Sequence, residues 1–308
     1  MLFRSPLSYF AGIGGAAKRG VLVKGASVLD ALADARTVVF DKTGTLTDGR
    51  FRVGELRPAD GFSAEDLLSA AASAGSHSNH PLARAVRAAW EATGKPHPGC
   101  DDGSYREIPG HGTSALVGGR EALAGGDRIL HLKDIPHRCE QPSDTVVHVA
   151  FAGRYAGSIE LGDGLKADAA AALDRLKRLG VRRLAMLTGD AEAPAKKAAA
   201  AAGVDELHHG LLPEGKIERL EAILAEERGR GTVLFVGDGI NDAPALARAD
   251  AGIAMGAAGS DAAVESADAV LMGDEPSRVA DAVAVARKTR RIDRKSTRLN
   301  SSHGKVSR

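Results

Sequence analysis

The sequence DKTGTLT, residues 41–47, decides how the rest of this chain is interpreted. It follows residues 37–40, whose β-branched and aromatic side chains predict a short buried strand. This strand ends on Asp41, and open α/β sheets bind their ligands at the carboxyl ends of their strands. A carboxylate there can act as a nucleophile, as in the aspartyl-phosphate intermediate of ATPases. The stretch therefore favours Asp41 as a phosphoryl acceptor over an ordinary turn residue.

The overall composition is that of an ordinary globular protein. The 308 residues suggest about two domains. The net charge of +1 and the aromatic content of 4% give no reason to expect nucleic acid as a partner. Cys100 and Cys139 form no Cys-x-x-Cys pair, which favours a reducing compartment. No apolar run reaches the ~18 residues of a membrane span, so we expect the chain by itself to be soluble.

Strands alternate with helices on both sides of a β-rich segment. Helical patterns at residues 167–179, 193–202, 216–227 and 277–291 accompany strand patterns at 183–187 and 232–236. Before them, residues 48–50 are predicted to form a turn, and residues 64–74 a helix with Ser63 as its N-cap. This alternation predicts an α/β fold with a doubly wound parallel sheet. We expect residues 17–48 and 161–294 to form that domain. Residues 49–160 are expected to form an inserted α+β domain.

The two ends of the sequence differ from the rest. Residues 1–16 are apolar and precede Lys18 and Arg19, as at the cytoplasmic end of a membrane helix. A buried amphipathic helix is the alternative. Residues 295–308 are rich in Ser, Lys, Arg and Asn without apolar periodicity, and we expect them to be disordered and foreign to the fold.

Further polar residues follow the predicted strands and should gather at one sheet edge with Asp41. Thr188 offers a hydroxyl, Gly189 a backbone amide, and Lys216 a positive charge for phosphate oxygens. The set suits phosphoryl transfer, which depends on positioning and charge neutralisation. The candidate catalytic residues are Asp41, Lys42, Thr43, Thr188, Gly189, Asp190, Lys216, Asn241 and Asp242.

Carboxylates after the last strand of this set suggest a cation. Asp238 and Asp242 lie in GDGINDAP, residues 237–244, and offer the hard oxygens that Mg²⁺ prefers. The candidate metal ligands are Asp41, Thr43 and Asp238.

DKTGTLT resembles the phosphorylation signature of P-type ATPases in the haloacid-dehalogenase-like superfamily. Thr188, Lys216 and Asp238 match the other motifs of that superfamily in order, which implies its fold and an Asp41 phosphorylated by ATP. Phosphatases of the superfamily usually carry a second Asp two residues after the nucleophile, where this chain has Thr43. A hydroxyl is a poor base for activating water, so a long-lived phosphoenzyme is expected.

The segment SNHPLA, residues 78–83, resembles the Ser-x-His-Pro motif of heavy-metal P-type ATPases. That resemblance implies a nucleotide pocket in the inserted domain, with His80 at the adenine. The candidate ATP-binding residues are His80, Pro81, Glu107, Gly110 and Gly112. The histidines at 77, 97, 131, 137, 208 and 209 show no convincing metal-ligand spacing with Cys100 or Cys139, and we interpret them as surface residues.

Together these features imply the ATP-binding and phosphorylation unit of a P-type ATPase that exports a heavy metal, with ATP and Mg²⁺ as cofactors. Zn²⁺, Cd²⁺ or Co²⁺ is favoured over copper, because Gly119 stands where some copper-type relatives carry Asn. The metal would contact only a membrane domain absent from this sequence. The full-length protein is then expected in the cell membrane, with these domains facing the cytoplasm. A soluble phosphatase and a nucleotide-binding module without turnover are the alternatives.

Overall fold

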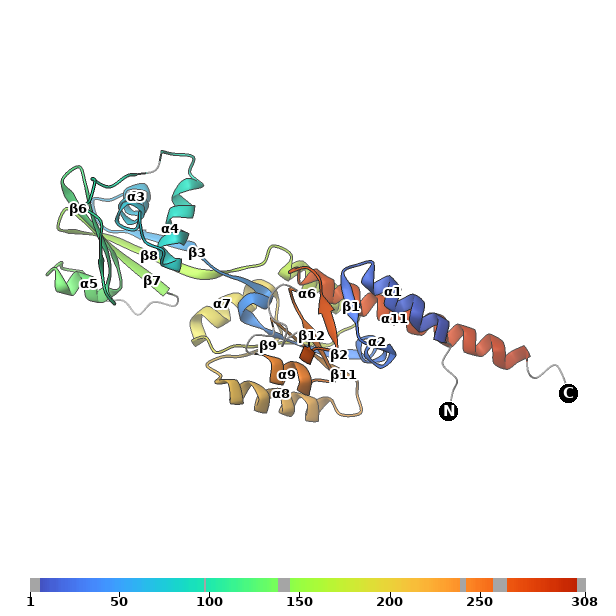
Figure 1. Ribbon diagram of the computed structural model, residues 1–308. Helices are drawn as coiled ribbons and strands as arrows, with labels where there is room; N and C mark the ends of the chain where they lie inside the picture. The colour runs from blue at the N-terminus through green and yellow to red at the C-terminus, as the bar shows by residue number, and fades with distance from the viewer. Residues whose placement is uncertain (1–5, 97, 138–144, 239–241, 257–264, 304–308) are drawn as a thin grey trace. The chain divides into compact units, whose positions relative to one another are not determined.

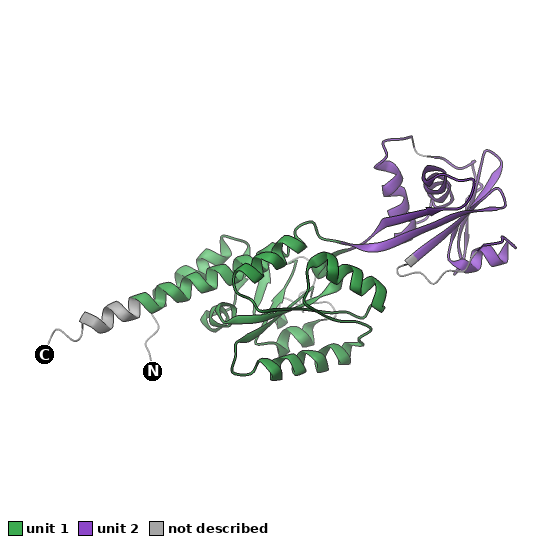
Figure 2. Cartoon of the chain, turned by 180° about the vertical axis from the view of Figure 1, so that it is seen from behind, with its two compact units in different colours: residues 1–48, 165–308 green, residues 49–164 purple. Residues whose placement is uncertain are grey.

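The computed structural model describes residues 6–96, 98–137, 145–238, 242–256 and 265–303. The chain forms two compact units, which Figure 2 shows in different colours. Unit 1 consists of residues 1–48 and 165–308, and unit 2 of residues 49–164. The second boundary lies four residues later than the sequence analysis expected.

Unit 1 is built on a seven-stranded sheet in the order β1-β13-β12-β11-β2-β9-β10 (Figure 1). Its strands run in parallel, except that β1 is antiparallel to β13. The predicted parallel α/β sheet is thus confirmed, with one antiparallel edge strand. The strands are β1 (Val21–Val23), β2 (Ala35–Asp41), β9 (Arg183–Leu187), β10 (Glu206–His208), β11 (Thr232–Gly237), β12 (Ala251–Ala254) and β13 (Ala269–Leu271).

Helices cover both faces of this sheet because its strands are apolar on both sides. Val38 and Phe40 of β2 belong to one hydrophobic core, whereas Val39 between them belongs to the other. The first core is covered by α1 (Pro6–Ala17), α2 (Ala26–Ala33), α6 (Ala169–Arg178), α7 (Glu192–Ala202) and α11 (Ser277–His303). The second is covered by α8 (Pro213–Glu227) and α9 (Ala243–Arg248).

The strand order changes direction beside β2. From β2 the chain builds β9 and β10 on one side, and then returns to build β11, β12 and β13 on the other. Loops that leave β2 and β11 therefore diverge, which opens the crevice where doubly wound sheets bind ligands. Asp41 is the last residue of β2 and lies at this point.

Unit 2 is a six-stranded sheet in the order β3-β8-β7-β6-β5-β4. Helices α3 and α4 cover one face, and α5 covers the other. Ser63 caps α3, as the sequence predicts, through a reciprocal capping box with Asp66. Its elements are β3 (Thr47–Pro58), α3 (Ala64–Ala74), α4 (Pro81–Glu91), β4 (Arg106–Ile108), β5 (Gly112–Val117), β6 (Arg120–Gly125), α5 (Asp127–Leu132), β7 (Thr145–Phe151) and β8 (Arg154–Leu165).

The C-terminal helix differs from expectation. Helix α11 begins at residue 277, as predicted, but runs to His303 instead of ending near residue 291. Residues 295–303, expected to be disordered, are therefore helical, and residues 304–308 lie outside the described part. Lys, Arg and Leu are good helix formers, and neither Gly nor Pro occurs between Ser277 and His303 to stop the helix.

The N-terminal helix α1 packs on unit 1. Tyr9 is buried and its hydroxyl donates to the Asp30 carboxylate at 2.7 Å, whereas Leu7 and Phe10 are exposed. None of the helices in the described residues is both long enough and apolar enough to cross a bilayer. The assignment of residues 1–16 to the end of a membrane helix stays a prediction.

Candidate functional site

A polar cavity of about 240 Å³ lies in unit 1 at the carboxyl ends of β2, β9 and β11. Asp41 ends β2, Thr188 follows β9, and Asp238 follows β11, so the sheet brings together residues far apart in sequence. The cavity is lined by Asp41, Thr43, Thr188, Gly189, Asp190, Lys216, Asp238 and Asp242. Apart from Lys42 and Asn241, all the candidate catalytic and metal residues line it. Asn241 lies outside the described residues.

Asp41 is an acid in an unusual environment. Its side chain is only 7% exposed, and Lys216 Nζ lies 2.5 Å from its Oδ1. Burial, together with the nearby negative charges of Asp242 and Asp238, raises the pKa of Asp41 to about 7 although Lys216 opposes the shift. Burial also raises the pKa of Asp242. The site therefore holds more negative charge than its lysine can neutralise.

Lys216 bridges two of these acids. Helix α8 begins with Pro213, and the first helical position suits a residue without a free N–H. Lys216 follows about one turn later in the same helix. Its ammonium group contacts Asp41 and also lies 3.2 Å from Asp242 Oδ1. Burial would lower the pKa of Lys216, but the two carboxylates outweigh it and raise that pKa. Lys216 is thus held as a cation beside the candidate nucleophile.

Lys42 has a different position from the other candidates. Its side chain is buried and forms an ion pair with Asp190, which lies in the loop that follows β9. The Asp190 amide donates to the Thr188 hydroxyl at 3.2 Å. Lys42 therefore fixes the Thr188–Asp190 turn and does not line the cavity itself.

Lys166 is a residue that the sequence analysis missed. Its side chain is 5% exposed, and its ammonium group donates to the Gly44 carbonyl at 2.7 Å, while its backbone amide donates to the Leu46 carbonyl at 2.9 Å. Gly44 has a φ of +72°, and a side chain there would meet the Asp238 carboxylate at 2.9 Å. Lys166 thus holds the turn that follows Asp41. The pattern Gly-Asp-Gly-Leu-Lys gave no local sign of this role.

The donor set of the cavity suits a hard divalent cation. If Asp41, Asp238 and Asp242 are all ionised, Lys216 neutralises one of three negative charges, and a dication would neutralise the other two. Mg²⁺ binds to one or two carboxylates and completes its shell with phosphate oxygens and water. Asp41 and Asp238, at the carboxyl ends of neighbouring strands, are the residues that fit this ion, and Thr43 lies at the same cavity.

A second cavity, of about 490 Å³, lies within unit 2. It is mainly apolar, with His80, Glu107, Gly110 and Gly112 in its wall, so four of the five candidate nucleotide residues surround one space. Pro81 is not in that wall; it begins α4, where its ring suits the first helical position.

His80 caps helix α4. Its Nδ1 accepts from the Leu82 amide at 3.3 Å, so in the neutral ring Nε2 carries the proton and can donate. A donor at the edge of an apolar cavity of this size can recognise a ring nitrogen of a base.

Glycines let two paired strands lie close together beside this cavity. Gly112 and Gly125 face each other on β5 and β6, and Gly112 has a φ of +147°. A side chain on Gly112 would come within 2.3 Å of the Ala124 carbonyl oxygen, and one on Gly125 within 2.1 Å of the His111 carbonyl oxygen. Only residues without side chains fit at this pair of positions.

Comparison with known proteins agrees with this geometry. Residues 35–250 match the haloacid dehalogenase-like hydrolase family. The chain is 51% identical over 287 residues to a zinc-transporting ATPase of Synechocystis sp. and 49% identical to a cadmium, zinc and cobalt-transporting ATPase of Bacillus subtilis. Each alignment covers 93% of this chain but only 39% and 40% of the relatives, so the chain spans about two fifths of their length.

A solved structure gives the same result. The crystal structure of a zinc-transporting PIB-type ATPase superposes with a TM-score of 0.83 at 36% identity, over 94% of this chain and 47% of that one. The chain therefore belongs to the haloacid dehalogenase-like hydrolase family and is homologous over 93% of its length to heavy-metal-transporting P-type ATPases.

Proposed function

We propose that this chain transfers the γ-phosphoryl group of ATP to Asp41, as the catalytic region of an ATPase that exports a heavy-metal cation. The observation that carries the proposal is a buried carboxylate held by Lys216 at the crevice of a doubly wound sheet. The relatives are named as transporters of zinc, or of cadmium, zinc and cobalt, which supports one of these divalent cations as the cargo. We also propose that the whole protein resides in the cell membrane with these units on the cytoplasmic side.

In this mechanism an Asp41 oxygen forms a bond to the γ-phosphorus, and the bond to the bridging oxygen breaks, so that ADP leaves with the electron pair. Lys216 stabilises the negative charge on the phosphoryl oxygens. The Thr188 hydroxyl and the Gly189 amide lie at the same cavity and can donate to those oxygens. Mg²⁺, held by Asp41 and Asp238, would neutralise the charge of the phosphates and keep Asp41 ionised.

The unit 2 cavity is proposed to bind ATP. His80 would donate from Nε2 to the adenine, Gly110 and Gly112 would let the backbone approach the nucleotide, and Glu107 would accept a hydrogen bond. Mainly apolar walls with a few polar groups are typical of nucleotide-sized pockets.

Labelling with Mg²⁺ and ATP that is radioactive at its γ-phosphate tests the proposal. We expect acid-stable phosphate on the wild-type chain that hydroxylamine removes, and none on Asp41→Asn, which keeps the size of the side chain but not its nucleophilic charge. Asp174→Asn, a change in an exposed acid of unit 1 outside the cavity, is the matched control and should label normally. Undiminished labelling of Asp41→Asn would exclude Asp41 as the acceptor.

The same experiment separates the alternatives. A soluble phosphatase would turn over without accumulating phosphoenzyme, and a binding module would bind ATP without any label. The position two residues after Asp41 carries Thr43, whose hydroxyl is a poor base for water. This observation favours accumulation of the phosphoenzyme.

A further inference from the structure

Three side chains of unit 2 that do not line its large cavity lie close together. Asp127 and His131 lie at positions i and i+4 of α5, on the same helix face, and His137 follows in the next loop. The Asp127 carboxylate lies 3.0 Å from His131 Nε2 and 2.5 Å from His137 Nε2. The two imidazole rings meet edge to face, with their centroids 4.8 Å apart.

The contacts of His137 determine what can occupy this point. Its side chain is 2% exposed, and its Nδ1 lies 3.0 Å from the Ile135 carbonyl oxygen. A carbonyl only accepts, so Nδ1 carries the proton, and Nε2 of the neutral ring presents a lone pair to the Asp127 oxygen. At 2.5 Å the two acceptors have room only for a shared proton between them, so the metal-free pair holds a second proton that a bound metal ion would displace.

We propose that Asp127, His131 and His137 bind a divalent transition-metal cation of the Zn²⁺ type, at a site separate from the catalytic carboxylates. Two imidazole nitrogens and one carboxylate oxygen form a donor set that Zn²⁺ accepts and Mg²⁺ does not favour. The three ligand atoms lie within 4.8 Å of one another, and ligands of a tetrahedral ion at ~2.1 Å are about 3.4 Å apart. Small side-chain rotations therefore suffice to enclose the ion.

The surroundings support a metal site rather than an isolated ion pair. Metal-binding histidines typically donate their other N–H to a carbonyl or carboxylate, as His137 does to Ile135. His148 lies beside His137, with ring centroids 5.9 Å apart, and its Nδ1 contacts the Tyr155 hydroxyl at 3.2 Å. His131 is exposed and Asp127 is partly exposed, so water can reach a fourth coordination position.

Zn²⁺ binding to the full chain, measured in excess Mg²⁺ by competition with a chromophoric chelator, tests the site. Excess Mg²⁺ competes for the carboxylates of the Asp41 cavity, and the histidine variants identify the Zn²⁺ that binds at Asp127. We expect one Zn²⁺ to bind the wild type and His131→Ala to weaken its binding by about tenfold or more. His131 is exposed, so this change leaves the fold intact. His137→Ala should have the same effect, and His209→Ala, an exposed histidine outside the cluster, should have none.

Co²⁺ provides an independent measurement. Bound in place of Zn²⁺, it should give the visible absorption of a low-coordinate nitrogen and oxygen site, and His131→Ala should lose that absorption. Equal Zn²⁺ affinity of the wild type, His131→Ala and His137→Ala would overturn the proposal. So would a wild type that binds no Zn²⁺ while His137 stays doubly protonated at neutral pH, because a proton would then fill the position.

Discussion

At the scale of single residues, the polar cavity beside Asp41 depends on groups that do not line it. Lys166 reaches back from the second half of the chain to hold the Gly44 carbonyl, 122 residues earlier. Its other contact is the Asp274 carboxylate at 2.7 Å, which is mostly exposed. The hydrogen bond to Gly44 is therefore the one that fixes the turn after Asp41.

We predict that Lys166→Met, which keeps the length of the side chain but removes its donor, slows phosphoryl transfer by about 10²-fold, because a small displacement of a reacting group has that effect. Labelling rates with ATP and with acetyl phosphate should fall by the same factor, since the nucleotide cavity is untouched. Asp274→Ala is the control and should label nearly normally. A loss confined to ATP would contradict a role in positioning Asp41.

His80 has two separable roles, and two substitutions distinguish them. Asn is a good helix N-cap, so His80→Asn should keep the stability of α4, whereas His80→Ala should lose about 1 kcal/mol of it. Both should weaken ATP labelling about tenfold, the equivalent of one hydrogen bond, while acetyl phosphate labelling stays unchanged. Measured unfolding curves and labelling at varied ATP check this. If His80→Asn labels with ATP as the wild type does, His80 only caps the helix.

The sequence predicted the residues of the site better than their contacts. Asp41, Thr188, Lys216 and Asp238 lie at strand ends or helix starts, and local patterns reveal such positions. Lys166 and the pair of His131 with His137 could not be found in that way, because their partners depend on how distant segments pack. The i, i+4 spacing of Asp127 and His131 was the one available signal, and it needs a helix that the sequence pattern did not suggest.

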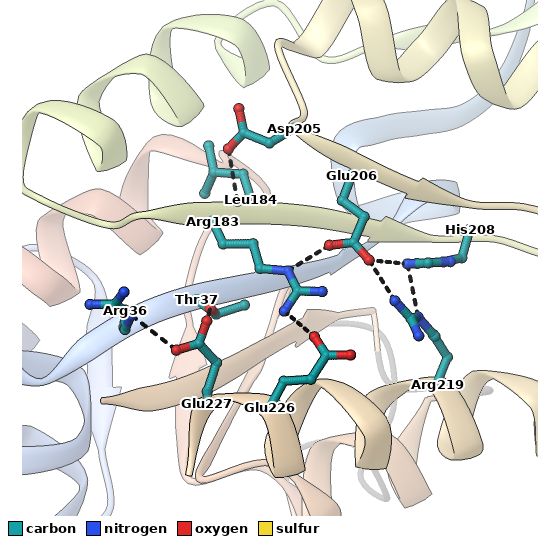
Figure 3. A network of polar contacts seen from close by, with 10 residues as sticks. All are labelled: Arg36, Thr37, Arg183, Leu184, Asp205, Glu206, His208, Arg219, Glu226 and Glu227. Atoms are coloured by element: carbon teal, nitrogen blue, oxygen red, sulfur yellow. Dashed lines mark hydrogen bonds and ion pairs between the residues drawn. The ribbon is translucent and has the colours of Figure 1, made fainter. Parts of the chain in front are cut away.

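At the scale of elements, a polar network joins β9, β10 and α8 (Figure 3). Glu206 of β10 accepts from Arg183 of β9 at 2.5 Å and from Arg219 of α8 at 2.7 Å, and its other neighbour is His208. A hydrogen bond from Arg183 lowers the pKa of Glu206 to about 2 from 4.5. Partial burial opposes this shift, and hydrogen bonds from Arg219 and His208 add to it. Glu206 therefore ties an edge strand, with few neighbours of its own, to the sheet and to the helix that presents Lys216.

We predict that Glu206→Gln lowers the free energy of unfolding by about 1–3 kcal/mol at neutral pH, the value of hydrogen bonds to charged groups. Because the folded pKa lies below the unfolded one, this stabilisation is complete above about pH 4.5 and is lost as the pH falls toward 2. Urea unfolding of the wild type and of Glu206→Gln between pH 4.5 and pH 2 should show the difference in their free energies of unfolding shrink as the pH falls. Glu192→Gln, in an exposed pair with Lys196, should change little at any pH. A stability difference between the two proteins that does not depend on pH would mean that the charge of Glu206 does not cause it.

Helices with strong periodicity were predicted closely, and short or atypical ones were not. The bounds of α3 agree with the expected 64–74, where a capping box fixes the start. Helix α5 is six residues long, too short for periodicity to appear, and it is stabilised by burial of Ile129 and Leu130 against the sheet. Residues 48–50, which were expected to form a turn, instead belong to strand β3, which begins at Thr47. Pairing of β3 with β8 overrides the local preference for a turn.

At the scale of the whole molecule, the two proposed activities are divided between the units. The residues that line the polar cavity beside Asp41 all belong to unit 1, and those that line the mainly apolar cavity beside His80 all belong to unit 2. Unit 2 is inserted between two neighbouring points of unit 1, because the Lys166 amide donates to the Leu46 carbonyl at 2.9 Å. A short linker can therefore join Asp48 to Leu165 without stretching unit 1.

We predict that unit 1 with residues 49–164 replaced by a short Gly-Ser linker folds and is labelled on Asp41 by acetyl phosphate in the presence of Mg²⁺. Labelling by ATP at the concentration that saturates the full chain should fall by at least about 10²-fold, because the binding energy that unit 2 contributes is absent. Circular dichroism checks the fold, and Asp41→Asn in the shortened chain checks the labelled residue. ATP labelling as efficient as in the full chain would place the nucleotide site within unit 1, and a folded chain that no donor labels would show that unit 2 also shapes the catalytic cavity.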